Sequence, residues 1–123
     1  MSNKPVIIVA EDEEYNFALI KIIFEKEGMN ILWAQNGEEA IDIYKNNSVV
    51  NLIFMDIKMP IMNGLDATRA IKKINKDIPI IALTAYTLPE DRDLCFEAGC
   101  DEFVTKPINR ANLVDTAYKW LDI

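Results

Sequence analysis

Three short, almost uniformly apolar runs limit the folds open to this chain more than any other feature. They are Val6–Ala10, residues 52–55 and Ile80–Thr84, and all three are rich in aliphatic side chains. A strand with one solvated face alternates apolar and polar residues, whereas a strand covered on both faces is apolar almost throughout. The runs therefore predict the central strands of a parallel sheet that has helices on both faces.

Two further runs, Asn30–Ala34 and Glu102–Thr105, also have the composition of strands. Helical periodicity and end signals predict helices between the strands, at residues 14–27, 37–46, 64–75, 89–98 and 110–121. Gly28 and Gly99 lie where a left-handed helix cap is needed. Strand and helix thus alternate five times. Because crossovers between parallel strands are right-handed, we expect a doubly wound α/β fold, (βα)5, with a five-stranded parallel sheet in three layers.

The first predicted helix has an apolar side. Ala18 and Ile22 share one face at helical spacing, Leu19 and Ile23 flank them, and Lys21 lies on the other face. Since an amphipathic helix packs its apolar stripe against the core, this pattern predicts that these four apolar residues lie on the buried face.

Composition narrows the class of protein. The chain has 123 residues, half of them hydrophobic, which is enough for one domain over residues 1–123 without disulfides. Its net charge of -7 gives no support to nucleic-acid or anionic-membrane binding and favours cations and basic partners. With no histidine and two cysteines, imidazole chemistry and most zinc sites are excluded. No stretch is long enough to span a bilayer or typical of a signal peptide, so a cytoplasmic location is expected.

Polar residues follow four of the predicted strands. Glu11 and Asp12 come after the first, Asp56 after the third, Thr84 ends the fourth, and Lys106 follows the fifth. Each alone has an ordinary explanation as a loop, cap, strand or surface residue. Ligands of open α/β sheets bind beyond the carboxyl ends of the strands, and together these residues predict a site there.

The residue types indicate the chemistry of that site. Three carboxylates at close range repel one another unless a cation lies between them. Hard oxygen ligands suit Mg²⁺, which commonly also binds phosphate oxygens. A carboxylate beside Mg²⁺ can attack phosphorus, while a hydroxyl and an ammonium group hold the transferred oxygens. The pattern therefore predicts phosphoryl transfer to an aspartate.

At residues 9–12, 55–64, 83–85 and 103–107 the chain resembles the receiver domains of two-component response regulators, which have a flavodoxin-like fold. The resemblance covers nearly the whole chain. It implies that Asp56 is the phosphoacceptor, that Asp12 binds Mg²⁺ directly and Glu11 more through water, and that the backbone carbonyl of Lys58 is a further ligand.

The same resemblance implies roles for residues nearer the end of the chain. Thr84 and Lys106 would contact the phosphoryl oxygens, and Pro107 would follow a cis peptide bond. Thr84 and Phe103 would form a switch, for which the small Ala85 leaves room, and the surface of residues 89–98, 102–105 and 110–121 would change with phosphorylation.

The resemblance also implies partners. A histidine kinase or histidine phosphotransfer protein would be the phosphodonor, and an effector or attached domain would receive the signal. Catalysis would be limited to self-catalysed phosphoryl transfer and autodephosphorylation. Glu11 replaces the more usual Asp, as in receivers of hybrid histidine kinases, and Lys58 and Tyr86 occupy variable positions flanking the site. The chain could be a stand-alone regulator or part of a longer hybrid kinase.

Three alternatives compete with this interpretation. A phosphatase of the haloacid-dehalogenase type also uses a nucleophilic Asp, but it needs a second Asp where this chain has Lys58. A flavodoxin-like nucleotide or flavin binder needs a phosphate-binding loop after the first strand, where this chain has four consecutive acidic residues, 11–14. An interaction module that is never phosphorylated would not need the complete acceptor set.

Overall fold

The computed structural model describes residues 4–47, 49–85 and 88–122. In these ranges, five strands alternate with five helices: β1 (Val6–Ala10), α1 (Glu14–Lys26), β2 (Asn30–Ala34), α2 (Gly37–Asn46), β3 (Leu52–Asp56), α3 (Gly64–Ile74), β4 (Ile80–Thr84), α4 (Pro89–Ala98), β5 (Glu102–Thr105) and α5 (Arg110–Leu121). Every predicted element is present. The boundaries differ only where α1 and α3 end one residue earlier and β3 extends to Asp56.

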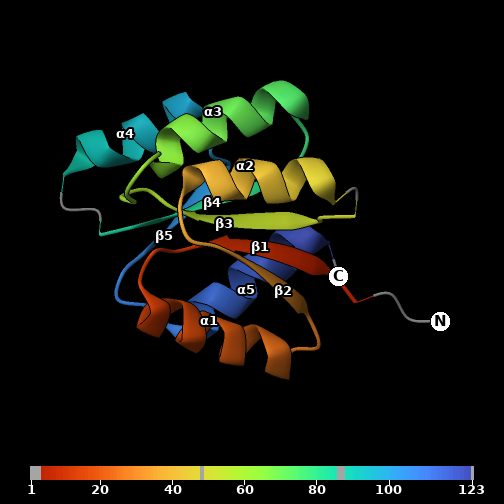
Figure 1. The fold of residues 1–123 in the computed structure, drawn as a ribbon. Coiled ribbons are helices and arrows are strands. Elements are labelled where there is room, and N and C mark those ends of the chain that lie inside the picture. Colours follow the sequence, from red (N-terminus) through yellow and green to blue (C-terminus); the bar gives the residue numbers. More distant parts are fainter. Residues whose placement is uncertain (1–3, 48, 86–87, 123) are drawn as a thin grey trace.

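The strands form one parallel sheet in the order β2-β1-β3-β4-β5. Helices α1 and α5 cover one face, and α2, α3 and α4 cover the other (Figure 1). The predicted doubly wound, three-layer, flavodoxin-like fold is therefore confirmed. The three uniformly apolar runs, β1, β3 and β4, are the three inner strands, as their composition predicted.

Each face of the sheet has its own apolar core. Between the sheet and α1 with α5, the rings of Phe24 and Phe54 lie 5.3 Å apart, and Leu113 is fully buried beside them. On the opposite face, Ile53 and Ile71 are fully buried. Successive residues of a strand point to opposite faces, so Ile53 and Phe54 serve different cores.

The buried face of α1 differs from the prediction. Phe17, Ile20, Ile23 and Phe24 are buried, whereas Ala18, Leu19 and Ile22 are exposed. Of the four residues predicted on the inner face, only Ile23 is buried. Apolar residues occupy more than one side of this helix, and the side with two phenylalanines buries more apolar area than the side with alanine.

Local signals explain several helix ends. The side chains of Asn36, Asn63 and Asn109 each accept a hydrogen bond from a backbone N–H in the first turn of α2, α3 and α5. Gly28 and Gly99 have φ angles of 79° and 112°, the left-handed conformation predicted for both. No helix in the described ranges has the length and apolar character needed to cross a membrane.

Candidate functional site

Three acidic side chains meet at the carboxyl edge of the sheet. Glu11 and Asp12 directly follow β1, and Asp56 is the last residue of β3, the strand next to β1. One carboxylate oxygen of each residue lies within 4.8 Å of the other two. Glu11 and Asp56 are buried while Asp12 is exposed, so the cluster has an interior side and a solvent side.

Lys106 bridges the two buried acids. It follows β5, and its Nζ lies 2.9 Å from Oε1 of Glu11 and 3.0 Å from Oδ2 of Asp56. Burial lowers the pKa of Lys106, but the hydrogen bonds and charges of the two carboxylates outweigh burial and raise this pKa above its usual value. The lysine is therefore a fixed cation, and the peptide bond between it and Pro107 is cis.

Asp56 is poorly solvated. Burial raises the pKa of its carboxyl group to about 6, with the charge of Glu11 adding to the rise and the hydrogen bond from Lys106 opposing it. One ammonium group thus serves two buried carboxylates, while Asp12 brings a third. The cluster carries excess negative charge that a divalent cation would neutralise.

The loop after β3 wraps closely around Asp56. The backbone N–H of Lys58 donates to Oδ1 of Asp56 at 3.3 Å. A Cβ atom at Gly64 would lie 2.0 Å from the backbone oxygen of Asp56, so no larger residue fits at that position without a backbone shift. Within the loop between Lys58 and Gly64, Ile61 has a φ of 68°. The N–H of Met62 donates to the carbonyl of Pro60 at 2.7 Å, which closes a tight turn centred on Ile61.

A cleft of about 380 Å³ opens above the cluster. Its lining residues are Asp12, Glu13, Asp56, Ile57, Lys58, Leu65, Thr84, Ala85, Asp91, Leu94, Cys95 and Lys106. Thr84 is buried at the end of β4, and Ala85 after it is exposed. The cleft therefore brings together Asp12, Asp56, Thr84 and Lys106 from four strand ends, while Glu11 lies buried behind them. Tyr86 lies outside the described residues.

Phe103 stands apart from the cluster. It is half-buried in β5, next to Ala82 of β4 in the sheet. Its ring packs edge-on against that of Phe96 in α4, with 6.1 Å between centroids. Phe103 thus links β5 to α4.

Sequence reasoning did not include Trp33 among the residues of the site. The indole N–H of Trp33 donates to the backbone carbonyl of Glu11 at 2.8 Å. In the sheet, Trp33 pairs with Val9, so a careful alignment of the two strands would have put it near the acidic loop.

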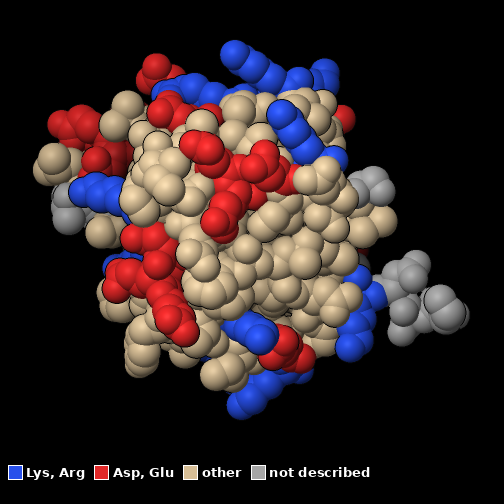
Figure 2. Space-filling model, viewed as in Figure 1, with Lys and Arg blue, Asp and Glu red and all other residues tan. Residues whose placement is uncertain are grey.

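Acidic side chains also surround the cleft. On the left of Figure 2, red atoms gather at the edge toward which the strands of Figure 1 run. Exposed acidic residues of this edge include Glu13, Glu14 and Glu90. The three inner carboxylates are hard oxygen donors with no histidine or cysteine among them, and such a set fits Mg²⁺ better than softer metals.

A flavodoxin-like sheet with acids, a hydroxyl and a lysine at its carboxyl edge is the architecture of a phosphoacceptor signalling domain. The family model described as "Response regulator receiver domain" matches residues 7–118. The chain belongs to this family and is a receiver domain of two-component signalling.

Relatives include both large and small proteins. Hybrid signal transduction histidine kinase I of Dictyostelium discoideum is 45% identical over 84% of this chain, which spans 6% of that protein. The autoinducer 1 sensor kinase/phosphatase LuxN of Vibrio harveyi is 33% identical over 98% of this chain, which spans 14% of LuxN. The polar-differentiation response regulator DivK of Brucella anthropi is 31% identical, with 94% of each chain covered.

Two solved structures are informative about the site. The receiver domain of a sensor histidine kinase from Pseudomonas aeruginosa has a magnesium ion coordinated in its active-site cleft; it is 29% identical, with a TM-score of 0.90 over 98% of this chain and 100% of that one. The receiver of Ssk1 from Saccharomyces cerevisiae, in complex with the histidine phosphotransfer protein Ypd1, is 29% identical, with a TM-score of 0.89 over 95% of this chain and 88% of that one.

Proposed function

We propose that this receiver accepts a phosphoryl group on the carboxylate of Asp56 in a reaction that requires Mg²⁺. The observation that carries the proposal is the position of Asp56. Its carboxylate lies beside the ammonium group of Lys106 and close enough to the carboxylates of Glu11 and Asp12 for all three to bind one metal ion. No other aspartate in the described chain combines burial, a lysine partner and two acidic neighbours.

In this proposal a carboxylate oxygen of Asp56 attacks phosphorus of a phosphohistidine donor. The bond from phosphorus to the donor's imidazole nitrogen breaks, and its electron pair stays on that nitrogen. Bound Mg²⁺ supplies charge neutralisation between the carboxylates and the incoming phosphoryl group. Asp12 and Asp56 would hold the ion directly, Glu11 more through water, and the backbone carbonyl of Lys58 would add a ligand.

Lys106 and Thr84 have different parts in holding the product. The ammonium group of Lys106 already contacts Asp56, so it can move its hydrogen bonds to phosphoryl oxygens formed on that side chain. The Thr84 hydroxyl at the cleft wall would donate a second hydrogen bond. Both contacts exist only in the phosphorylated state, and they therefore favour it.

The same contacts give a means of signalling. Movement of Thr84 toward the phosphoryl group would leave space that Phe103 can enter, with the small Ala85 leaving room for the shift. Phe103 packs on Phe96, so its movement would change the contact between β5 and α4. The changed surface of α4, β5 and α5 would be read by an effector or an attached domain.

The relatives suggest the kind of donor. Several are kinases, and the Ssk1 receiver is seen with a histidine phosphotransfer protein. We infer that the phosphodonor of this chain is a histidine kinase or a histidine phosphotransfer protein. The transfer would take place in the cytoplasm, and residues 1–123 would form one receiver domain. Catalysis by the receiver itself would extend to its own phosphorylation and dephosphorylation.

The test is phosphoryl incorporation from acetyl phosphate, followed by intact-protein mass spectrometry. The wild-type chain should gain one phosphoryl group with Mg²⁺ and none with EDTA. Asp56→Asn should gain none, and Asp12→Asn should gain it at least tenfold more slowly. Asp66→Asn is the matched control, because Asp66 is an exposed aspartate in α3, and it should behave as wild type. Full incorporation in Asp56→Asn would refute the proposed acceptor.

A further inference from the structure

The peptide group that joins Glu11 to Asp12 is held by the end of β2. The N–H of Glu11 donates to the carbonyl of Ala34 at 2.9 Å, which continues the pairing of β1 with β2. The carbonyl of Glu11 accepts from the indole N–H of Trp33 at 2.8 Å. A side chain 22 residues away in sequence thus completes the hydrogen bonding of the first acidic residue.

The indole ring is itself fixed in place. It stacks on the ring of Phe17 in α1, with centroids 4.4 Å apart and planes 7° from parallel. Phe17 is buried, so its ring has little freedom to move and restricts the orientation of the indole ring. Trp33 therefore joins three parts of the molecule: the end of β2, the acidic loop and the beginning of α1, which lie next to one another in Figure 1.

Asp12 depends on its backbone more than the other two acids do. The side chain of Glu11 is held by Lys106 and by the N–H of Glu13, and that of Asp56 by Lys106 and the N–H of Lys58. In the part of the chain that the structure describes, the exposed carboxylate of Asp12 has no hydrogen bond. The backbone at its Cα therefore fixes where its Cα–Cβ bond points, and with it the positions that the carboxylate can reach.

Because a peptide unit is planar, the carbonyl of Glu11 and the N–H of Asp12 turn together. We propose that Trp33 is a positioning residue of the metal site: by fixing this peptide plane, its indole N–H keeps the carboxylate of Asp12 directed toward Asp56. The inference rests on the proposed Mg²⁺ site. It assigns to Trp33 a share of the cation affinity although the indole hydrogen-bonds only to the backbone of Glu11 and to no carboxylate of the cluster.

Trp33→Phe removes the indole N–H and keeps an aromatic ring for Phe17. The chain offers a matched control in Trp120, its other tryptophan. The indole N–H of Trp120 also donates to one acceptor, Oε1 of Glu102 at 2.9 Å, but Glu102 begins β5 at the opposite edge of the sheet. Trp120→Phe therefore deletes the same group with no connection to the acidic loop.

Affinity for Mg²⁺ is measured by isothermal titration calorimetry on the intact chain. Trp33→Phe loses one hydrogen bond that positions Asp12, so its affinity for Mg²⁺ should be roughly three- to tenfold weaker than that of wild type. Trp120→Phe should bind Mg²⁺ as tightly as wild type does. Replacement of Trp33 by its benzothiophene analogue keeps the two-ring shape without the N–H, and it should show the same loss as Trp33→Phe. Equal Mg²⁺ affinity in wild type and both Trp33 variants would overturn the inference.

A second readout separates positioning from general stability. In metal-free protein, amide hydrogen exchange at Asp12 and Glu13 should accelerate in Trp33→Phe relative to wild type and to Trp120→Phe, while exchange in β3 and β4 stays the same. In wild type, the indole N–H resonance of Trp33 should shift on addition of Mg²⁺ and that of Trp120 should not. Uniformly faster exchange across the sheet would contradict a positioning role. A wild-type chain that binds no Mg²⁺ would instead refute the metal site itself, and this outcome is visible before any variant is made.

Discussion

The carboxyl group of Asp56 is buried, yet the proposed reaction requires it to be ionised. Its pKa of about 6 means that the metal-free fold disfavours the charged form relative to an ordinary aspartate, although the ionised form still predominates at pH 7. Nucleophilic attack on phosphorus needs the ionised form. A cation held by Glu11 and Asp12 would meet this need, because a nearby positive charge lowers the pKa of a carboxyl group.

The raised pKa of Asp56 predicts a pH-dependent cost to stability. An unfolded aspartate has a pKa of about 4. The stability gained by keeping Asp56 protonated is therefore complete below about pH 4 and is lost as the pH rises through about 6. In EDTA, the free energy of unfolding of Asp56→Asn relative to wild type should increase by about 2 kcal/mol between pH 4 and pH 7. Urea unfolding at both pH values measures this change, and a difference that does not change with pH would contradict the prediction.

Ile61 is a second residue with an unusual environment. It is 76% exposed and has a left-handed φ of 68°, which β-branched residues rarely adopt. Asn tolerates this conformation, and little apolar burial is lost on replacement. Ile61→Asn should therefore raise the free energy of unfolding by about 1 kcal/mol, measured by urea unfolding. Ile22→Asn is the control, because Ile22 is also exposed but lies in a regular helix, and it should give no gain.

At the residue scale, the sequence was informative wherever a polar residue directly ends a strand. Asp56, Thr84 and Lys106 could be placed because the carboxyl ends of parallel strands meet at one edge. An alignment of β2 with β1 would bring Trp33 only as far as the neighbourhood of the acidic loop, because its hydrogen bond to the backbone carbonyl of Glu11 depends on the direction of the ring. Side chain direction in a strand of mixed composition is not encoded in periodicity.

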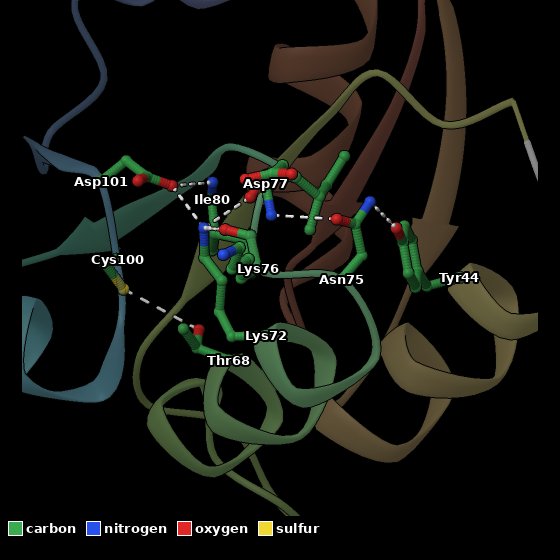
Figure 3. A network of polar contacts seen from close by, with 10 residues as sticks. Tyr44, Thr68, Lys72, Asn75, Lys76, Asp77, Ile80, Cys100 and Asp101 are labelled. Carbon is green, nitrogen blue, oxygen red and sulfur yellow. Dashed lines mark hydrogen bonds and ion pairs between the residues drawn. The ribbon is translucent and has the colours of Figure 1, made fainter.

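Among the elements, α3, β4 and β5 are joined by a polar network at the amino edge of the sheet (Figure 3). Nζ of Lys72 in α3 donates to Oδ2 of Asp101 at 2.8 Å and to the carbonyls of Lys76 and Ile78 at 3.2 and 2.7 Å. The same oxygen of Asp101 accepts from the N–H of Ile80. This network fixes the beginnings of β4 and β5 at the edge opposite the acidic cluster.

Loss of the Lys72 ammonium group should weaken the whole domain. Among the described residues, Lys72→Met removes one donor from two carbonyls and leaves Asp101 with only the N–H of Ile80 in a partly buried site, so the free energy of unfolding should fall by about 2 kcal/mol. Lys73→Met, on the exposed side of the same helix, should change it by less than about 0.5 kcal/mol. Chemical denaturation of the two variants measures both values. Equal stability of the two would show that the network contributes nothing.

Element positions followed from the sequence almost completely, because glycine and asparagine caps stand at the helix ends and the apolar runs are well separated. The buried face of α1 did not follow. Its sequence offers two overlapping apolar stripes, and the choice between them depends on which side chains fit the sheet, where Phe24 meets Phe54. That complementarity is a property of the packed core.

Across the whole molecule, the two edges of the sheet have opposite character. The amino edge is held by the Lys72 network, in which positive and negative groups are paired. The carboxyl edge carries more acids than bases around the cleft, consistent with the net charge of -7. The fold itself could be predicted from the sequence because strand order in a doubly wound sheet is limited by handed crossovers.

The acidic edge predicts that Mg²⁺ stabilises the whole domain. An ion that binds only the folded state raises the free energy of unfolding by an amount set by its concentration relative to Kd, about 2.7 kcal/mol at one hundred times Kd. Millimolar Mg²⁺ should therefore raise the unfolding temperature by several degrees in calorimetry. Asp12→Asn should reduce this increase, and Lys73→Met should keep it. An unfolding temperature that is insensitive to Mg²⁺ would speak against a cation between the three acids.

The most direct test of the central claim is to locate the phosphoryl group in the unaltered chain. After reaction with acetyl phosphate and Mg²⁺, borohydride reduction converts an aspartyl phosphate to homoserine, which tandem mass spectrometry can assign to one position. We expect homoserine at position 56 alone, and only in the sample that contained Mg²⁺. Homoserine at position 12, or a stable phosphoryl group on a hydroxyl side chain with position 56 unmodified, would contradict it.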